Sequence, residues 1–403
     1  MDLTPILLDW SALALRWLHL IAGIAWIGSS FYFMALDASL KKRAGLPEGV
    51  SGETWQVHGG GFYRMWKYGV APPEMPAELT WFKWEAYTTL LSGLALLVVV
   101  YYLGAELYMI DPAKAELGPW TAAAIGLAVL VLGWVAYDML CKSPLGNDQR
   151  TLALIGLVAF PLVCLALDQV LTGRAAFLHV GALIGTIMVA NVAMIIIPNQ
   201  KKVVASLLAH AAPDPALGAQ AKQRSVHNNY LTLPVLFIMI SNHYPQTFAS
   251  PFNWLILALV LVIGASIRHY FNIMHAGTKP PWWPWAVAAL GFIVAIWIAS
   301  FPATPPPLVD TAADERPATL AAVEEIVQGR CIMCHGRETY WPGLAHAPKG
   351  VVLESPRDIR IHADAIRAQV YQTHAMPPGT ISLIEDGERR LIARWVDAGA
   401  PAE

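Results

Sequence analysis

The run SALALRWLHLIAGIAWIGSSFYFMAL, residues 11–36, is apolar over almost its whole length, and Arg16 is its only formal charge. A helix rises about 1.5 Å per residue, so this run is long enough to cross a hydrocarbon core of about 30 Å. The ten residues before it carry no Lys or Arg, which argues against a secretory signal peptide. We therefore expect residues 11–36 to form a first transmembrane helix.

The rest of the chain has the same character. Of its 403 residues, 56% are hydrophobic and 14% charged, against about 25% charged in a typical soluble domain. Seven further apolar segments of about the length of a span follow, near 84–104, 120–140, 151–171, 176–198, 229–246, 253–272 and 282–301. The predicted fold is an all-α polytopic membrane bundle of about eight spans in contact with membrane lipid. The net charge of −2 and the lack of a basic run exclude a nucleic-acid partner.

The basic residues predict an orientation. Loops after the odd-numbered spans hold fourteen Lys and Arg residues, whereas loops after the even-numbered spans hold two, Lys114 and Arg174. Cytoplasmic loops carry the excess of positive charge, so the odd loops should be cytoplasmic and both termini should lie outside. The expected location is the bacterial inner membrane, crossed several times.

A specific motif follows the last span. The segment Cys331-Ile-Met-Cys334-His335 has the C-x-x-C-H spacing of c-type haem attachment. Cys331 and Cys334 would form the thioether bonds, and His335 would bind the iron. About forty residues later, the segment HAMPPG (374–379) offers Met376 as the second iron ligand, a pair that suits electron transfer. The alternative is a disulfide or redox CxxC pair.

The same region predicts a small domain of the class I cytochrome c type. A helix is expected near 318–329 and a closing amphipathic helix over 385–398, with Leu391, Ile392 and Trp395 on one face. We expect three parts: a membrane domain (1–301), a Pro-rich linker (302–316) and a soluble domain (317–403). Haem attachment is completed in the periplasm, which agrees with the orientation from the basic residues.

Two membrane segments resemble each other. Trp17-Leu-His19 in the first span matches Phe177-Leu-His179 in the fifth, and this similarity predicts a parallel 4+4 repeat. Such repeats place functional sites between their halves. His19 and His179 could be axial ligands of a b-type haem, or each imidazole could simply hydrogen-bond a neighbouring helix. Both interpretations stay open at this point.

Polar side chains gather at the predicted cytoplasmic ends of spans 2, 3, 6 and 7. They are Glu85, Tyr87, Asp138, His227, Asn228, Asn229, Tyr230, Arg268, His269, Tyr270 and Asn272. Such a set suits binding of a small planar polar ligand and proton transfer. The loop HGGGFYR (58–64) could cover it as a lid, or be a plain flexible loop.

The chain resembles a known family over nearly its whole length. The resemblance rests on five runs and the haem domain after them: residues 17–33, 58–64 (HGGGFYR), 70–76 (VAPPEMP), 81–89 (WFKWEAYTT) and 227–233 (HNNYLTL). They are similar to the bacterial membrane-bound urate hydroxylases. The resemblance implies oxidation of urate to 5-hydroxyisourate with oxygen from water. Electrons would pass through the c-type haem to a soluble cytochrome c or a terminal oxidase of the respiratory chain.

Within that resemblance, the polar cluster supplies candidate catalytic residues. Glu85 or His227 would be the base, Arg268 would hold the negative charge of urate, and Asn228 and Asn229 would orient it. If the site lies at the cytoplasmic end, an intramembrane haem b held by His19 and His179 would relay electrons outward. Two other classes remain: a quinol-linked electron-transfer subunit, and a transporter with an accessory cytochrome.

Overall fold

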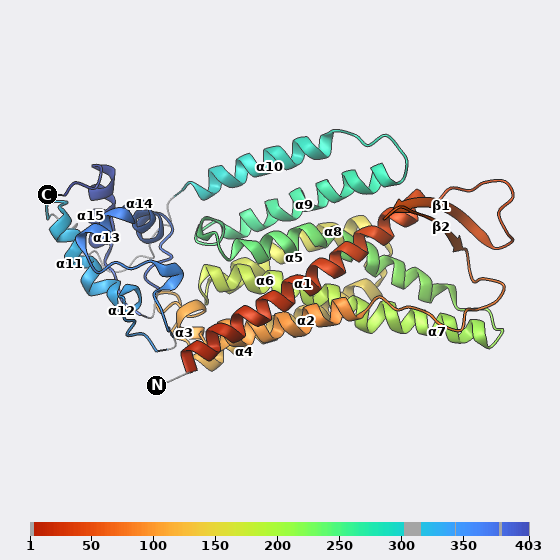
Figure 1. Cartoon of the computed structure of the whole chain (residues 1–403), viewed down its shortest axis with the longest axis horizontal. Coiled ribbons are helices and arrows are strands. Elements are labelled where there is room, and N and C mark those ends of the chain that lie inside the picture. The colour runs from red at the N-terminus through yellow and green to blue at the C-terminus, as the bar shows by residue number, and fades with distance from the viewer. Residues whose placement is uncertain (1–3, 302–315, 343, 379–380, 403) are drawn as a thin grey trace.

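The computed structural model of the chain describes residues 4–301, 316–342, 344–378 and 381–402. These residues form a long helical bundle with a small helical domain at one end, and α1 begins at that same end (Figure 1). Most of the predicted linker, residues 302–315, lies outside the described residues.

The bundle is built from helices that run along one long axis. In chain order they are α1 (Thr4–Ser39), α2 (Trp84–Leu96), α4 (Pro119–Lys142), α5 (Gln149–Asp168), α6 (Gly173–Ala190), α7 (Ile197–Leu208), α8 (Pro215–Ser241), α9 (Asn253–His275) and α10 (Trp283–Ala299), with the short α3 (Ala105–Tyr108) between α2 and α4. A π-helical segment, Leu97–Tyr102, extends α2, and another, Asn191–Ile196, joins α6 to α7.

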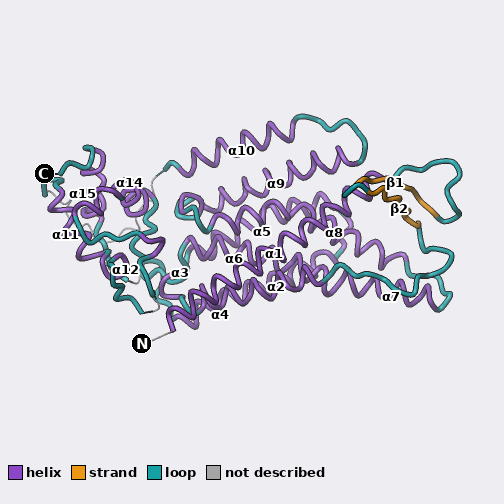
Figure 2. The backbone as a smooth tube through the Cα atoms, viewed as in Figure 1, coloured by secondary structure: helices purple, strands orange, loops and turns teal. Residues whose placement is uncertain are grey.

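Six helices of the described residues are long and apolar enough to cross a membrane: α1, α2 with its π segment, α4, α5, α6 joined to α7, and α9. The other two predicted spans run beside them as α8 and α10 (Figure 2). The helix α10 has only 17 residues, and the first half of α8 carries polar side chains. The mostly helical fold is confirmed and is compatible with a membrane bundle, while the count of eight spans stays a prediction.

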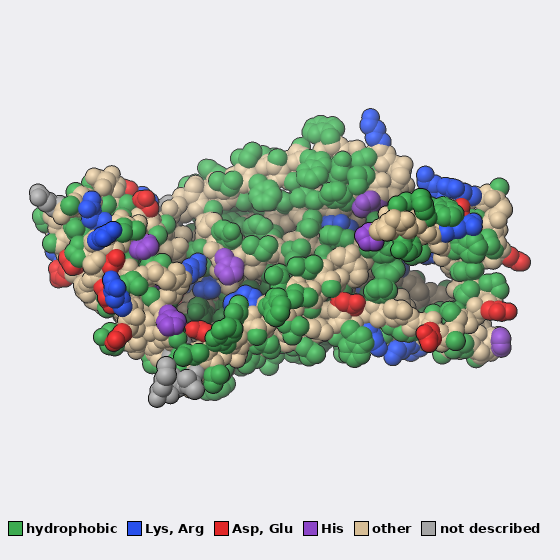
Figure 3. Space-filling view, in the orientation of Figure 1, with side chains coloured by type: hydrophobic (Ala, Val, Ile, Leu, Met, Phe, Trp, Pro, Cys, Tyr) green, Lys and Arg blue, Asp and Glu red, His purple; other side chains and the backbone are tan. Residues whose placement is uncertain are grey.

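Helix α6 forms the centre of the bundle. Its side chains Phe177, Ile184 and Ile187 are almost completely buried, whereas α1 exposes Trp10, Trp17 and other large apolar side chains. Apolar side chains also cover much of the outer face of the bundle (Figure 3). A surface of this kind is stable against lipid tails and would associate in water.

The two halves of the bundle are packed differently. Helix α9 packs along α8 and α10. Helix α5 holds the place in the predicted repeat that corresponds to α10, but it packs against α6 and α9 and not along α4. Gly264 of α9 allows the closest of these approaches, because a Cβ there would lie 2.5 Å from Cδ of Pro234 in α8. The predicted 4+4 repeat is therefore not apparent in the neighbours of each helix.

One element departs from the all-α prediction. Strands β1 (Val50–His58) and β2 (Gly61–Tyr68) form an antiparallel hairpin that projects from the end of the bundle opposite the small domain (Figure 2). Gly59 and Gly60 make its turn with positive φ angles, a conformation that glycine adopts at low cost. The segment predicted as a lid or a flexible loop is thus the tip and second strand of this hairpin.

The small domain contains α11 (Leu320–Arg330), α12 (Ile332–His335), α13 (Pro356–Ile361), α14 (Ala363–Arg367), a π-helical segment (Ala368–Gln372) and α15 (Asp386–Asp397). The two predicted helices are α11 and α15, with boundaries shifted by one or two residues. Leu391, Ile392 and Trp395 of α15 are fully buried against Val323 and Ile326 of α11. Burial of each such side chain contributes about 1.5–3 kcal/mol.

Candidate functional sites

The CxxCH motif lies where α11 ends and α12 begins. All four cysteines of the chain are free thiols, so Cys331 and Cys334 form no disulfide in this structure. Burial raises the pKa of Cys331 to about 12. A redox-active CxxC pair needs an accessible thiolate of low pKa, so this environment disfavours the redox alternative.

His335 is oriented by a single hydrogen bond. Its Nδ1–H donates to the carbonyl oxygen of Val351 at 2.8 Å, which fixes the tautomer and leaves Nε2 able to bind a metal. The backbone N–H of Leu353 donates to the carbonyl of His335 at 2.8 Å. The segment around Val351, sixteen residues after His335, thus holds both the ring and the backbone of His335.

Met376 is held in place through its backbone. Its N–H donates to the carbonyl of Gln369 at 3.0 Å, and its own carbonyl accepts a hydrogen bond of 2.9 Å from Nη1 of Arg389 in α15. The Met376 side chain packs on the apolar core that also touches Cys331 and Ile332. The thioether and the CxxCH motif therefore share one apolar neighbourhood.

These four residues fit a covalently attached haem. Two free thiols lie beside an imidazole whose Nε2 is available, and a thioether packs on the same core. Within the described residues, no group of three or more His, Cys, Asp or Glu side chains could hold a metal ion. A haem iron does not require such a group, because the porphyrin supplies its other ligands.

The polar cluster predicted in the bundle is divided by α8 into two networks. The first, which we call the Arg224 network, joins Asp138, Arg224, Asn191, Tyr137 and His227. Nη2 of Arg224 donates to Oδ1 of Asp138 at 2.8 Å, and Asn191 Nδ2 donates to the Tyr137 hydroxyl at 3.1 Å. Tyr137 OH in turn donates to Nδ1 of His227 at 2.7 Å.

Both ring nitrogens of His227 are engaged in this network. Nε2–H donates to Oε1 of Gln149 at 2.8 Å, so Nδ1 is the unprotonated nitrogen that accepts from Tyr137. Asn228 is also committed, because its Nδ2 donates to the carbonyl of Met188 and its Oδ1 accepts from Asn191, both at 2.9 Å. Neither His227 nor Asn228 is therefore free to contact a ligand.

A π-helical turn places Asn191 in this network. Pro198 has no N–H and cannot donate to the carbonyl four residues earlier, which favours a local bulge in the helix. The bulge spans Asn191–Ile196. Asn191 is completely buried at its start.

The second network, the Arg268 site, lies between α1, α8 and α9. Nη2 of Arg268 donates to Oδ1 of Asn272 at 3.2 Å, and Asn272 Nδ2 donates to Oδ1 of Asn229 at 2.9 Å. The guanidinium lies over the Phe31 ring, with Cζ 4.0 Å from its centroid. Among the described residues, Nε of Arg268 and Nδ2 of Asn229 find no acceptor.

The charge of this site is unbalanced. Arg268 is 3% exposed, and no carboxylate of the described residues pairs with it. A buried guanidinium without a counter-charge is strongly destabilising unless an anion joins it. The site is therefore prepared for an anionic ligand with hydrogen-bond acceptors.

Glu85 is a predicted catalytic residue outside this network. It occupies the first turn of α2 and is partly buried, and its carboxylate has no hydrogen-bond partner among the described residues. Tyr230 and His269 form a separate pair, with Tyr230 OH 3.1 Å from Nδ1 of His269. Of the predicted catalytic residues, the structure thus brings together Asn229 and Arg268.

The paired histidines do not face each other. Nδ1–H of His19 donates to the carbonyl of Thr89 in α2 at 2.9 Å, and a Cβ on Gly93 would come within 2.9 Å of its ring. The ring of His179 stacks instead on Tyr102. Tyr102 follows Gly93, which the His19 ring contacts, by nine residues of the same helix, or about 13 Å. The two axial ligands of one haem must face each other across a single ring, so this pair does not fit a shared haem b.

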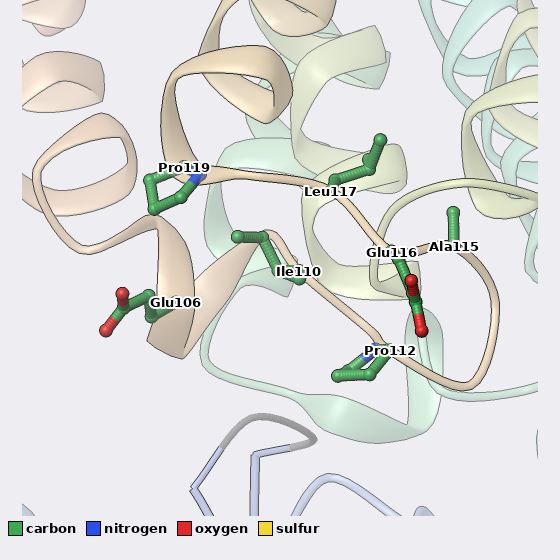
Figure 4. A pocket seen from close by; sticks show the side chains of 7 residues that line it. All are labelled: Glu106, Ile110, Pro112, Ala115, Glu116, Leu117 and Pro119. Atoms are coloured by element: carbon green, nitrogen blue, oxygen red, sulfur yellow. The ribbon is translucent and has the colours of Figure 1, made fainter.

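Two hollows lie at opposite ends of the bundle. One, of about 500 Å³, is lined by Glu106, Ile110, Glu116 and other residues around α3 and the start of α4 (Figure 4), at the end that carries the small domain. The other, of about 890 Å³, lies between the end of α1, the segment 67–81, α7 and α8. The size of the second is within the usual range for small-molecule sites.

Phe31, Asn191 and Gln149 were not predicted as site residues. Asn191 is an asparagine inside an apolar run that ends in a proline, and this combination could have been noticed. Phe31 and Gln149 carry no comparable signal, because an aromatic residue in a membrane helix and a glutamine at a helix start are both ordinary.

The geometry defines a helical protein with several helices long and apolar enough to cross a membrane, a buried arginine without a carboxylate partner among the described residues, and a motif suited to a c-type haem. Comparison with protein families identifies it further: residues 5–299 match the family described as urate oxidase, N-terminal, and the chain belongs to this family. Searches of curated proteins and of solved structures gave no match. The family match covers the bundle and stops before the small domain.

Proposed function

We propose that the protein is a membrane-bound urate hydroxylase whose C-terminal domain carries a c-type haem. In this proposal it oxidises urate to 5-hydroxyisourate with water as the oxygen source, in the bacterial inner membrane. Both termini and the haem domain lie in the periplasm. The electrons leave to a soluble cytochrome c or a terminal oxidase.

The observation that carries the proposal is the unpaired Arg268 in a member of the urate oxidase family. Urate is a planar monoanion near neutral pH and presents several carbonyl oxygens and ring nitrogens. The Arg268 guanidinium offers Nε–H to such an acceptor, and Asn229 offers an amide N–H. Phe31, already stacked on the guanidinium, supplies an apolar wall suited to a flat ring.

The reaction balances without dioxygen. A bond forms between the oxygen of water and C5 of urate, two electrons leave the ring, and the monoanion releases one net proton. Glu85 is the base in this proposal, because its carboxylate is not engaged elsewhere, whereas His227 has both ring nitrogens engaged. Arg268 holds the negative charge of the substrate through the reaction, and Asn229 orients it.

The electron acceptor in the chain is assigned to the small domain. Cys331 and Cys334 would hold the haem covalently, and His335 and Met376 would be its axial ligands. When bound, the haem supplies one-electron transfer at a potential raised by the thioether ligand. Hydrogen bonds with the Val351 carbonyl and Arg389 hold the His335 ring and the Met376 backbone in position.

The test is an anaerobic optical titration of the purified protein with urate. We expect the haem bands to reach the reduced spectrum given by dithionite. Reduction by quinol and not by urate would contradict the proposal and indicate a quinol-linked electron-transfer subunit. Absence of haem from protein matured in cells that attach c-type haem would remove the electron path.

Variants separate binding from chemistry. Arg268→Gln should weaken urate binding about 10–100-fold, because a charge-assisted hydrogen bond contributes about 1.5–3 kcal/mol. Glu85→Gln should bind urate and fail to reduce the haem. Arg174→Gln is the matched control, since Arg174 is an arginine at the other end of the bundle, bonded to Asn242. Full urate-dependent reduction by Glu85→Gln would contradict its role as the base.

A further inference from the structure

The larger of the two hollows is lined in part by residues that lie one helical turn from residues of the Arg268 site. It has a volume of about 890 Å³. Its wall includes Met34 in α1, Ser225 in α8, and Trp81, which precedes α2. On one helix face, residues three or four apart are neighbours. Phe31 therefore lies one turn from Met34 in α1, and Asn229 lies one turn from Ser225 in α8. Glu85 follows Trp81 by four residues, in the first turn of α2.

The rim of the hollow carries more positive than negative charge. Lys67 and Asp37 form an ion pair of 2.7 Å, and Lys222 also lines the hollow. Lys222 is exposed and has no carboxylate partner among the described residues. One positive charge therefore remains, and a cleft lined by one sign of charge attracts ligands of the other.

The hollow at the other end has the opposite character. Its lining includes Glu106 and Glu116 and no Lys or Arg (Figure 4). Carboxylates would repel an anion. The lining charges thus favour approach of an anion from the end opposite the small domain.

We propose that this hollow, which we call the vestibule, is the entrance through which the anionic substrate reaches the Arg268 site. Lys222 attracts the anion, and Ser225, which lines the hollow, lies one turn of α8 before Asn229. The inference rests on the proposed function, because it names the access route to that same site. Substrate then enters at one end of the bundle and electrons leave at the other.

The first experiment uses the full-length holoprotein in sealed proteoliposomes. Ferricyanide, which does not cross the membrane, distinguishes molecules whose haem domain faces out from those whose haem domain faces in. Molecules whose haem domain faces in have the vestibule facing out, so urate added outside should reduce the haem that ferricyanide cannot reach. Selective reduction of the ferricyanide-accessible haem would overturn the vestibule and keep the enzyme, whereas no reduction even after detergent is added would contradict the proposed function itself.

The second experiment tests the residues of the vestibule. Lys222→Glu should raise KM for urate about three- to fivefold at low salt with kcat unchanged, and added salt should reduce the difference. Lys202→Glu, on the exposed face of α7 outside the vestibule, makes the same charge change as a control. Equal effects of the two variants would overturn the role of Lys222.

A cysteine at position 225, in the lining of the vestibule, provides a direct probe of the substrate route. Ser225→Cys should react with a charged maleimide, and bound urate should slow that reaction. Modification should raise KM or block reduction of the haem. Unimpeded turnover after complete modification would show that the substrate takes another route.

Discussion

His179 is a buried residue in which one of the two ring nitrogens forms a hydrogen bond. Nδ1–H donates to the carbonyl of Ala175 at 2.8 Å, but Nε2 has no acceptor or donor nearby. A Cβ on Gly126 would lie 2.4 Å from that nitrogen, so glycine is required opposite the ring. His19 is bonded to α2 at another level, so similarity in sequence did not produce equivalent surroundings.

This difference predicts independent effects of the two histidines. His19→Ala should leave the haem content of the purified protein unchanged, because its partners are Thr89 and Ser92 of α2. A pyridine haemochrome assay on both single variants measures the content of c-type and b-type haem. Loss of one b-type haem per chain in both His19→Ala and His179→Ala would contradict the present geometry and restore the shared haem.

The hairpin is an element whose stability depends on one carboxylate. Glu53 in β1 accepts hydrogen bonds from Nε of Arg64 at 2.8 Å and from Nε1 of Trp66 at 3.2 Å. The Arg64 guanidinium also lies between the rings of Trp55 and Trp66. The bonds from Arg64 hold the pKa of Glu53 below its usual value of 4.5.

A lowered carboxyl pKa stabilises the fold above the unfolded pKa and ceases to do so as pH falls through the folded pKa. We therefore expect high protection factors for hydrogen exchange in β1 and β2 from pH 7 to pH 5, and lower protection factors only when Glu53 is protonated below about 4.5. Glu53→Gln should exchange several-fold faster already at pH 7. Glu48→Gln, in the exposed loop before β1, is the control, and an equal effect there would refute the role of Glu53.

Elements of the small domain were easier to predict than those of the bundle. A soluble helix must bury one face, so the spacing of Leu391, Ile392 and Trp395 predicted both α15 and the residues in its core. The bundle exposes apolar side chains on its outer face as well, as a surface suited to lipid does, so the spacing of apolar residues no longer marks the inner face. Asn228 and Asn229 were consequently assigned one role, although a turn of about 100° per residue sends them to different networks.

The hairpin was missed for another reason. Two glycines, Gly59 and Gly60, stand between runs rich in aromatic and β-branched residues, which is a recognised hairpin pattern. Three consecutive glycines, 59–61, also suit a flexible loop, so the hairpin was not predicted. The π-helical turn at Asn191 has a partial signal in the sequence, because Pro198 favours a bulge before it. Its extent, Asn191–Ile196, depends on how α6 packs against α4 and α8.

On the scale of the whole molecule, the Arg268 site and the CxxCH motif lie far apart. Arg268 lies fifteen residues from Asn253, the end of α9 nearest the small domain, a distance of about 22 Å along the helix. In the proposed function, electrons from urate would cover this distance before they reach the haem motif. The driving force supplied by the acceptor therefore matters, and in the proposed assembly Met376 sets it.

Met376→His should keep the covalent haem, since Cys331 and Cys334 are unchanged, but replace the thioether with an imidazole. The midpoint potential should fall by on the order of 0.1–0.3 V, so urate should reduce the haem only partly while binding with unchanged affinity. Redox potentiometry and the anaerobic titration measure the two quantities on the same sample. Met333→His, at a partly exposed position inside the CxxCH motif, is the control and should keep the potential of the wild type. An unchanged potential in Met376→His would show that Met376 is not the ligand, and the electron path would then need another axial residue.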